Sequence, residues 1–98
     1  MSIWAQGTVN IGRALAATAE IQEQTSVSLY ADREGGRVGI KADPAGNRRA
    51  CAVTHRGAVH VSCRAALRAV GWDGRPGHLP ARIEDGMVVF APPRGAAE

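Results

Sequence analysis

The sequence contains few aromatic residues and few cysteines. Phe, Trp and Tyr make up 4% of its 98 residues, which leaves little for base stacking on single-stranded nucleic acid. Two cysteines are too few for the disulfide framework of a small secreted fold. No apolar run reaches the roughly 18–20 residues of a membrane-spanning helix, and no secretion signal follows Met1. We therefore expect a cytoplasmic protein that does not enter a membrane.

The short motifs of common catalytic sites are also missing. The sequence has no phosphate-binding P-loop, no Gly-x-Gly-x-x-Gly and no nucleophile elbow. Acidic residues occur mainly at expected turns, where solvated carboxylates are common, and they do not form a recognisable catalytic pair. We expect neither enzymatic activity nor a cofactor.

Lysine is nearly absent, and the basic residues are unevenly distributed. Arginine supplies eleven of the twelve basic residues, and the net charge is +3. Residues 1–44 carry four basic and five acidic side chains, whereas residues 45–98 carry eight and four. This arginine bias, with abundant Ala and Gly, is typical of GC-rich coding in a bacterium or its phage. The local positive excess suits a polyanion-binding face, and the alternative is a solvated surface.

Two stretches fifty positions apart share one pattern. QGTVNIG begins at Gln6 and RGAVHVS begins at Arg56, and each leads into an Ala- and Leu-rich segment. Self-similarity at a fixed period is the signature of a repeated structural unit. A shift of fifty pairs Gly7 with Gly57, Val9 with Val59, Leu29 with Leu79, Glu34 with Glu84, Gly36 with Gly86 and Val38 with Val88.

Each copy predicts a strand, a short helix and a hairpin. Apolar residues alternate in the strand, as expected when one face of a sheet is buried. The helices are expected over roughly 13–21 and 63–70. SVSLYADREGGRVGIKA predicts two strands around a Gly-Gly turn, and HLPARIEDGMVVFA predicts two around Asp85-Gly86. Pro80 favours an edge position for its strand.

These motifs resemble a known DNA-binding family. GTVNIGRALAATAEIQEQTSVSLYADREGGRVGIKADP, from Gly7, resembles the swapped-hairpin domain of AbrB-like transition-state regulators and MazE-like antitoxins. Residues from Gly57 to Pro92 resemble a second unit, and two units in one chain is the arrangement of MraZ-like proteins. The resemblance covers nearly the entire chain. It implies a pseudo-dimeric β-barrel of interleaved hairpins that binds duplex DNA.

The expected fold is therefore mainly β with two short helices, arranged as a duplicated swapped-hairpin β-barrel with pseudo-two-fold symmetry. Residues 1–98 form one domain, in which repeats 2–44 and 52–93 flank a linker at 45–51. One such unit is too small to bury its own apolar face, and two pressed together would bury both. The alternative is coincidence between two unrelated hairpins.

The sequence departs from the family at several motif positions. Gly12 and Ser62 stand where the family usually has Pro after the first strand. Before the strand's Gly, where the family usually has a basic residue, the first copy has Gln6. The Asp-x-x-x-Arg helix signature of MraZ is absent. The family's basic positions carry over only to Arg13, Arg56 and Arg64.

Arginine-rich segments of the second half suggest how DNA would be contacted. The planar guanidinium group suits phosphate and the major-groove edge of guanine. Arg64 and Arg68 are four residues apart and share one face of the expected helix. We expect a small transcriptional regulator that contacts duplex DNA. The expected DNA-binding residues are Arg13, Arg48, Arg49, Arg56, His60, Arg64 and Arg68.

The sequence also allows two other interpretations. Cys51, His55, His60 and Cys63 have the spacing C-x3-H-x4-H-x2-C, which matches no common zinc motif, and we expect no metal. The alternative function is a protein-interaction adaptor of phage or mobile-element type that docks on a host complex. Its arginines would then meet an acidic protein surface. A chain this small buries only about 60–70% of its unfolded surface, so formation of a homodimer would increase the surface that it buries.

Overall fold

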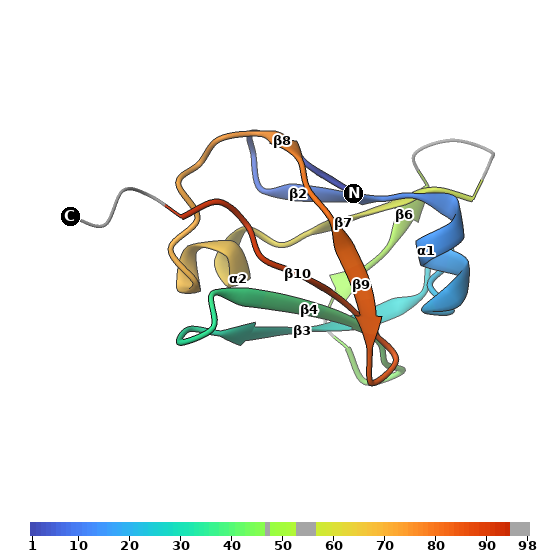
Figure 1. The fold of residues 1–98 in the computed structure, drawn as a ribbon. Helices are drawn as coiled ribbons and strands as arrows, with labels where there is room; N and C mark the ends of the chain where they lie inside the picture. The colour runs from blue at the N-terminus through green and yellow to red at the C-terminus, as the bar shows by residue number, and fades with distance from the viewer. Residues whose placement is uncertain (47, 53–56, 95–98) are drawn as a thin grey trace.

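The computed structural model describes residues 1–46, 48–52 and 57–94, with the backbone alone described at 49, 51 and 52. Two antiparallel sheets lie one above the other, and the two helices lie at opposite ends of the molecule (Figure 1). No helix among the described residues is long and apolar enough to cross a membrane. The predicted mainly β fold with two short helices is confirmed.

Each sheet has five strands within the described residues. Sheet A contains, in spatial order, β6 (Cys51–Ala52), β7 (Val59–Ser62), β2 (Thr8–Ile11), β1 (Ser2–Ile3) and β8 (Gly77–His78). Sheet B contains β5 (Arg48–Arg49), β3 (Ser26–Asp32), β4 (Arg37–Ala42), β10 (Met87–Phe90) and β9 (Ala81–Glu84). The helices are α1 (Arg13–Thr18) and α2 (Arg64–Ala69).

The prediction of a closed barrel is wrong, because the strands form two separate sheets in the described part of the chain. The chain passes from β5 in one sheet to β6 in the other through the buried residue Ala50. Ala50 donates its N–H to the carbonyl of Thr25 and accepts from the N–H of Gln24. These bonds tie Ala50 to the loop before β3 and interrupt the ladder that closure would require. The expected linker at 45–51 thus contains β5.

The hairpins form where the sequence predicts them. β3 pairs with β4 and β9 with β10, both antiparallel. In the second hairpin, Asp85 and Gly86 have φ of 51° and 77°, the positive values that a type I′ turn requires. β9 is an edge strand, as Pro80 before it predicts.

Both helices are shorter than predicted. α1 is followed by Glu20 at φ 59°, and this left-handed residue prevents the helix from continuing to the predicted residue 21. α2 is followed by Gly71 at φ 82°. Here the N–H of Trp72 donates to the carbonyl of Leu67, which closes the helix as the glycine predicts.

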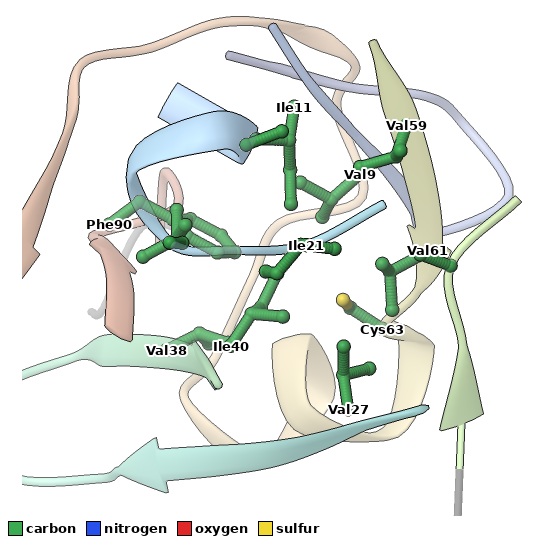
Figure 2. Packing of buried hydrophobic residues seen from close by; sticks show 14 of the residues in the cluster. Val9, Ile11, Ile21, Val27, Val38, Ile40, Val59, Val61, Cys63 and Phe90 are labelled. Carbon is green, nitrogen blue, oxygen red and sulfur yellow. The ribbon is translucent and has the colours of Figure 1, made fainter. Parts of the chain in front are cut away.

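Alternating residues of the two sheets form one hydrophobic core (Figure 2). In β2, Val9 and Ile11 are buried, whereas Thr8 and Asn10 are half-buried on the other face. The helices add Ala16 and Leu67 to this core. The buried residues labelled in Figure 2 are Val9, Ile11, Ile21, Val27, Val38, Ile40, Val59, Val61, Cys63 and Phe90.

The strand register relates positions fifty residues apart. At the centre of sheet A, β2 pairs with β7 and Asn10 lies opposite His60. At the centre of sheet B, β4 pairs with β10 and Gly39 lies opposite Val89. The neighbouring pairs lie symmetrically on either side of these two pairs, with partners 52 or 48 residues apart. Val9 pairs with Val61, Ile11 with Val59, Val38 with Phe90 and Ile40 with Val88.

The helices cross between the two halves of the chain. α2, from the second half, packs against β3 of the first half. α1, from the first half, packs against β9 of the second half. Each helix therefore covers a hairpin that belongs to the other half.

Candidate nucleic-acid interface

Arg64 and Arg68 lie on the exposed face of α2. The helix starts directly after β7 because Cys63 points into the core and the chain turns there. Residues four apart lie one above the other on a helix, so both guanidinium groups leave from one side. The first turn of α2 contains no acidic residue, and both arginines are exposed.

A third arginine joins them from another element. Arg48 of β5, exposed at the edge of sheet B, lies beside the start of α2. These arginines line one open hollow, which we name the α2 hollow. Among the described residues its lining contains no carboxylate, so the side chains that line it make it positively charged. The lining residues are Arg48, Ser62, Arg64, Ala65 and Arg68.

Arg13 lies at the other end of the molecule. It is the first residue of α1 and stands against Gly57, whereas Arg64 stands against Gly7. Gly57 precedes β7 and Arg64 follows it, so the two arginines flank this strand. Six residues of extended chain between 57 and 63 span about 20 Å. The structure therefore does not bring Arg13 into the α2 hollow.

His60 lies between these two ends, on the outer face of sheet A. It is opposite Asn10 in the register, and its ring centroid is 5.5 Å from that of Trp4 with the planes tilted by 36°. The side-chain oxygen Oδ1 of Asn10 is buried and has no hydrogen-bond partner among the described residues. The centre of the face is therefore polar.

Two of the predicted residues cannot be placed. Arg56 lies outside the described residues, and the side chain of Arg49 is likewise not described. Of the seven predicted residues, the α2 hollow brings together Arg48, Arg64 and Arg68.

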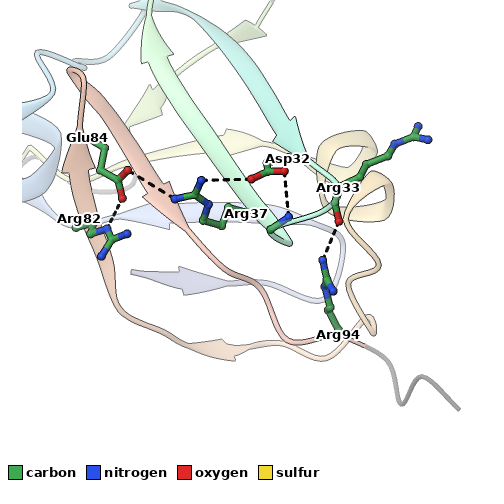
Figure 3. A network of polar contacts seen from close by, with 7 residues as sticks. Asp32, Arg33, Arg37, Arg82, Glu84 and Arg94 are labelled. Carbon is green, nitrogen blue, oxygen red and sulfur yellow. Dashed lines mark hydrogen bonds and ion pairs between the residues drawn. The ribbon is translucent and has the colours of Figure 1, made fainter.

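Other arginines are engaged in polar contacts within the fold (Figure 3). Arg37 pairs with Asp32 at 3.3 Å and with Glu84 at 3.6 Å, and Arg82 also pairs with Glu84. Arg94 donates to the backbone carbonyl of Arg33. By contrast, within the described ranges no carboxylate lies within ion-pair distance of Arg13, Arg64 or Arg68.

Two of the four cysteine and histidine residues considered as metal ligands have described side chains, and these two lie on opposite faces of β7. Cys63 is fully buried, and this burial raises the pKa of its thiol to about 12, against a smaller opposite effect of Arg48. His60 lies on the opposite face of the strand, beside Trp4. His55 lies outside the described residues, as does the side chain of Cys51. No cluster of three potential ligands occurs in the part of the chain that is described.

Sequence reasoning missed three residues at this interface. Ser62 lines the α2 hollow, and Asn10 and Trp4 surround His60. Strand parity could have found Ser62 and Asn10, because both alternate with buried valines and must face outward. No sequence signal indicated that Trp4 would lie beside His60.

Comparison of the chain with protein-family models, with curated proteins and with solved structures finds no match.

Proposed function

We propose that this protein binds duplex DNA and acts as a small regulator of transcription. The observation that carries the proposal is the α2 hollow, where Arg48, Arg64 and Arg68 converge and where the described lining residues include no carboxylate. Guanidinium groups on a concave surface are suited to phosphate, which they contact with two parallel N–H donors.

The proposal includes an internal doubling of the swapped-hairpin unit. The central strand pairs of both sheets relate positions fifty residues apart, such as Asn10 with His60 and Gly39 with Val89. Each helix also packs on the hairpin of the other half. These relationships support two interleaved units about a near-two-fold axis, which is the arrangement that the resemblance to AbrB-like domains implies.

Sheet A supplies a surface of suitable size between the two helix starts. Arg13 and Arg64 lie about 20 Å apart at its ends, estimated from the rise of an extended strand. The major groove of B-DNA is about 12 Å wide, so the two arginines can reach phosphates on both sides of it. Asn10 and His60, between them, would face the bases. Phosphate contacts fix position, and polar contacts at base edges give sequence preference.

The two ends of this surface are unequal. The α2 hollow contains three arginines, whereas the start of α1 contributes Arg13 from the described residues. We therefore propose that the α2 end anchors the duplex and that the α1 end adds a weaker contact. Loss of Arg64 should cost more affinity than loss of Arg13.

Fluorescence anisotropy with a labelled random-sequence duplex tests the proposal. We expect binding that weakens steeply with salt, and each lost phosphate contact should reduce the log–log salt slope by about 0.9. Arg64→Gln and Arg68→Gln should each lower both affinity and slope. Arg82→Gln is the matched control, because Arg82 is exposed but pairs with Glu84.

Two results would contradict DNA binding. One is the absence of salt-sensitive binding to any duplex. The other is an equal loss of affinity in Arg64→Gln and Arg82→Gln, which would indicate only a general effect of charge. Co-purification of a stoichiometric protein, with no nucleic acid absorbance, would favour the adaptor function instead.

A further inference from the structure

Four neighbouring strands of sheet A each place one polar residue at the same level of the sheet. His60 of β7 lies opposite Asn10 of β2. Asn10 is in turn opposite Ser2 of β1, and Ser2 is opposite His78 of β8. Residues that pair directly across antiparallel strands have their side chains on the same face of the sheet. We name these four residues the polar row, and it crosses sheet A at right angles to the strands.

The polar row lies on the outer face of the sheet. The residues next to it along the strands include Ile3, Val9 and Val61, all of which are buried in the core. Because side chains alternate between the two faces of a strand, the polar row must face away from the core. His78 is exposed, and the other three residues of the row are half-buried.

Asn10 has a hydrogen-bonding capacity that the fold does not use. Its Oδ1 is buried and has no hydrogen-bond partner among the described residues. A buried acceptor without a partner costs free energy, and this acceptor has no bond to lose when its side chain turns outward. An amide that both accepts and donates matches the paired donor and acceptor on the major-groove edge of adenine. The side chain of Asn10 is therefore suited to adenine.

The two arginines at the ends of β7 set the direction of the groove relative to this row. Arg13 and Arg64 flank the strand, so phosphates that they contact lie on opposite sides of the groove, and the groove runs across the strands. We propose that the polar row reads consecutive base pairs along the major groove, an inference that rests on the DNA binding proposed above. The row and the groove then have the same direction.

The spacing of the strands gives the length of DNA that is read. Neighbouring strands lie about 4.8 Å apart, so the three steps from His60 to His78 span about 14 Å. Successive base pairs of B-DNA are about 3.4 Å apart, so the polar row extends over about four base-pair steps. Asn10 and His78 are two strands apart, and this distance corresponds to about three base pairs.

The residue types in the row differ in the bases that they suit. Asn10 would contact adenine. The ring N–H of a histidine can donate to the N7 and O6 acceptors of guanine, which suits His60 and His78 to guanine. The hydroxyl group of Ser2 both donates and accepts, so it accommodates several bases and discriminates least. We therefore expect separate base preferences at the Asn10 and His78 positions, about three base pairs apart.

Selection of preferred sequences from a random duplex pool tests this inference. Fluorescence anisotropy then compares the selected duplex with duplexes that each carry one changed base pair. We expect Asn10→Ala to abolish the preference for adenine at one position, and His78→Ala to abolish a preference about three base pairs away. Each lost contact should remove about 5- to 150-fold of discrimination. Because Asn10 is uncharged, Asn10→Ala should leave the salt slope on random duplex unchanged.

Gln22→Ala is the matched control, because it removes an exposed amide in the loop between α1 and β3, outside sheet A. It should retain every base preference, and circular dichroism establishes that each variant folds. Salt-sensitive binding to random duplex without any preferred sequence would overturn the polar row and leave DNA binding standing. Preferences that both Asn10→Ala and His78→Ala retain would do the same. Absence of salt-sensitive binding to any duplex would overturn both proposals.

Discussion

Gly7 and Arg64 are in such close contact that a Cβ on Gly7 would lie 2.9 Å from the Cβ of Arg64. Gly57 stands in the same relation to Arg13, at 2.9 Å from its Cγ, and both glycines have a φ of 90°. Each glycine therefore lets the loop of one half approach the first residue of the helix in the other half. The two motif glycines of the sequence are thus the points at which the halves interlock.

Alanine at either motif glycine should destabilise the fold. At Gly7 the added methyl group meets the Cβ and backbone Cα of Arg64, and at both positions the positive φ is strained for a residue with a side chain. We expect Gly7→Ala to cost about 1–3 kcal/mol. Gly57→Ala should cost less, because it meets mainly the flexible side chain of Arg13. Urea unfolding measures both.

Gly12→Ala is the matched control for these changes. Gly12 has φ −64°, and nothing lies within 4 Å of a Cβ placed on it. Alanine there should be neutral or stabilise the protein by about 0.4–1 kcal/mol through the unfolded chain. Equal destabilisation at all three glycines would contradict the interlocking contacts.

Substitutions at two adjacent residues of α2 should have separate effects, one on stability and the other on nucleic-acid binding. Leu67 is fully buried and Arg68 is exposed. Leu67→Ala should lower the free energy of unfolding by about 2–5 kcal/mol, because it removes buried surface and leaves a cavity. Arg68→Ala should change stability little and weaken duplex binding. Thermal unfolding and anisotropy measured on both variants check the separation, and the opposite pattern would contradict the placement of α2.

Stability should decrease at alkaline pH because of Cys63. Burial raises the pKa of this thiol from 9.0 to about 12, so between these values the unfolded chain releases a proton that the folded chain retains. Ionisation then favours unfolding, and the decrease begins as pH rises through 9. Cys63→Ala removes this effect, so its stability difference from the wild type should shrink between about pH 8 and pH 10.5.

Urea unfolding at the two pH values measures this change. Cys51→Ser, with Cys63 intact, is the control and leaves the effect of Cys63 in place. A constant difference between Cys63→Ala and the wild type would show that the thiol ionises equally in both states.

Asp43 should support the fold above acidic pH. Its carboxylate accepts from the hydroxyl of Ser28 at 2.7 Å and from the N–H of Ala45 at 2.9 Å, and these bonds lower its pKa below 3.8. The stabilisation is present above about pH 4 and is lost as pH falls through the lower pKa of the folded state. Asp43→Asn should therefore be less stable than the wild type at neutral pH, and the difference should narrow in acid.

Urea unfolding at neutral pH and at about pH 3 compares Asp43→Asn with Glu34→Gln, a change in the exposed turn of the first hairpin. Glu34→Gln should show no such narrowing. A difference for Asp43→Asn that is independent of pH would contradict the role of its ionised form.

Local sequence patterns predicted most secondary elements correctly. Alternation of apolar residues in VNI and VHV marks β2 and β7, and Asp85-Gly86 marks the turn of the second hairpin. These features depend on neighbouring residues alone, so strands and turns of this kind can be predicted from the local sequence. The C-terminal end of α1 was missed because Glu20 adopts a positive φ at a position where the sequence has no glycine.

The outline of the candidate interface was only partly predictable. Arg64 and Arg68 follow from helical spacing. Their proximity to Arg48 does not follow from local sequence. Arg48 belongs to the two-residue strand β5, which reaches this place by pairing with β3. The separation of Arg13 from this group likewise depends on how the two halves cross.

By itself, the sequence determined the strands of the repeated motif and of the two hairpins, the hairpin turns and the apolar alternation, because each follows from conformational preferences and burial within a few residues. Only the tertiary structure decided that the strands form two open sheets, that Ala50 breaks the ladder between them, and that three arginines share one hollow. Those outcomes depend on contacts between residues distant in the chain, whose geometry is fixed when the helices and hairpins of the two halves pack together.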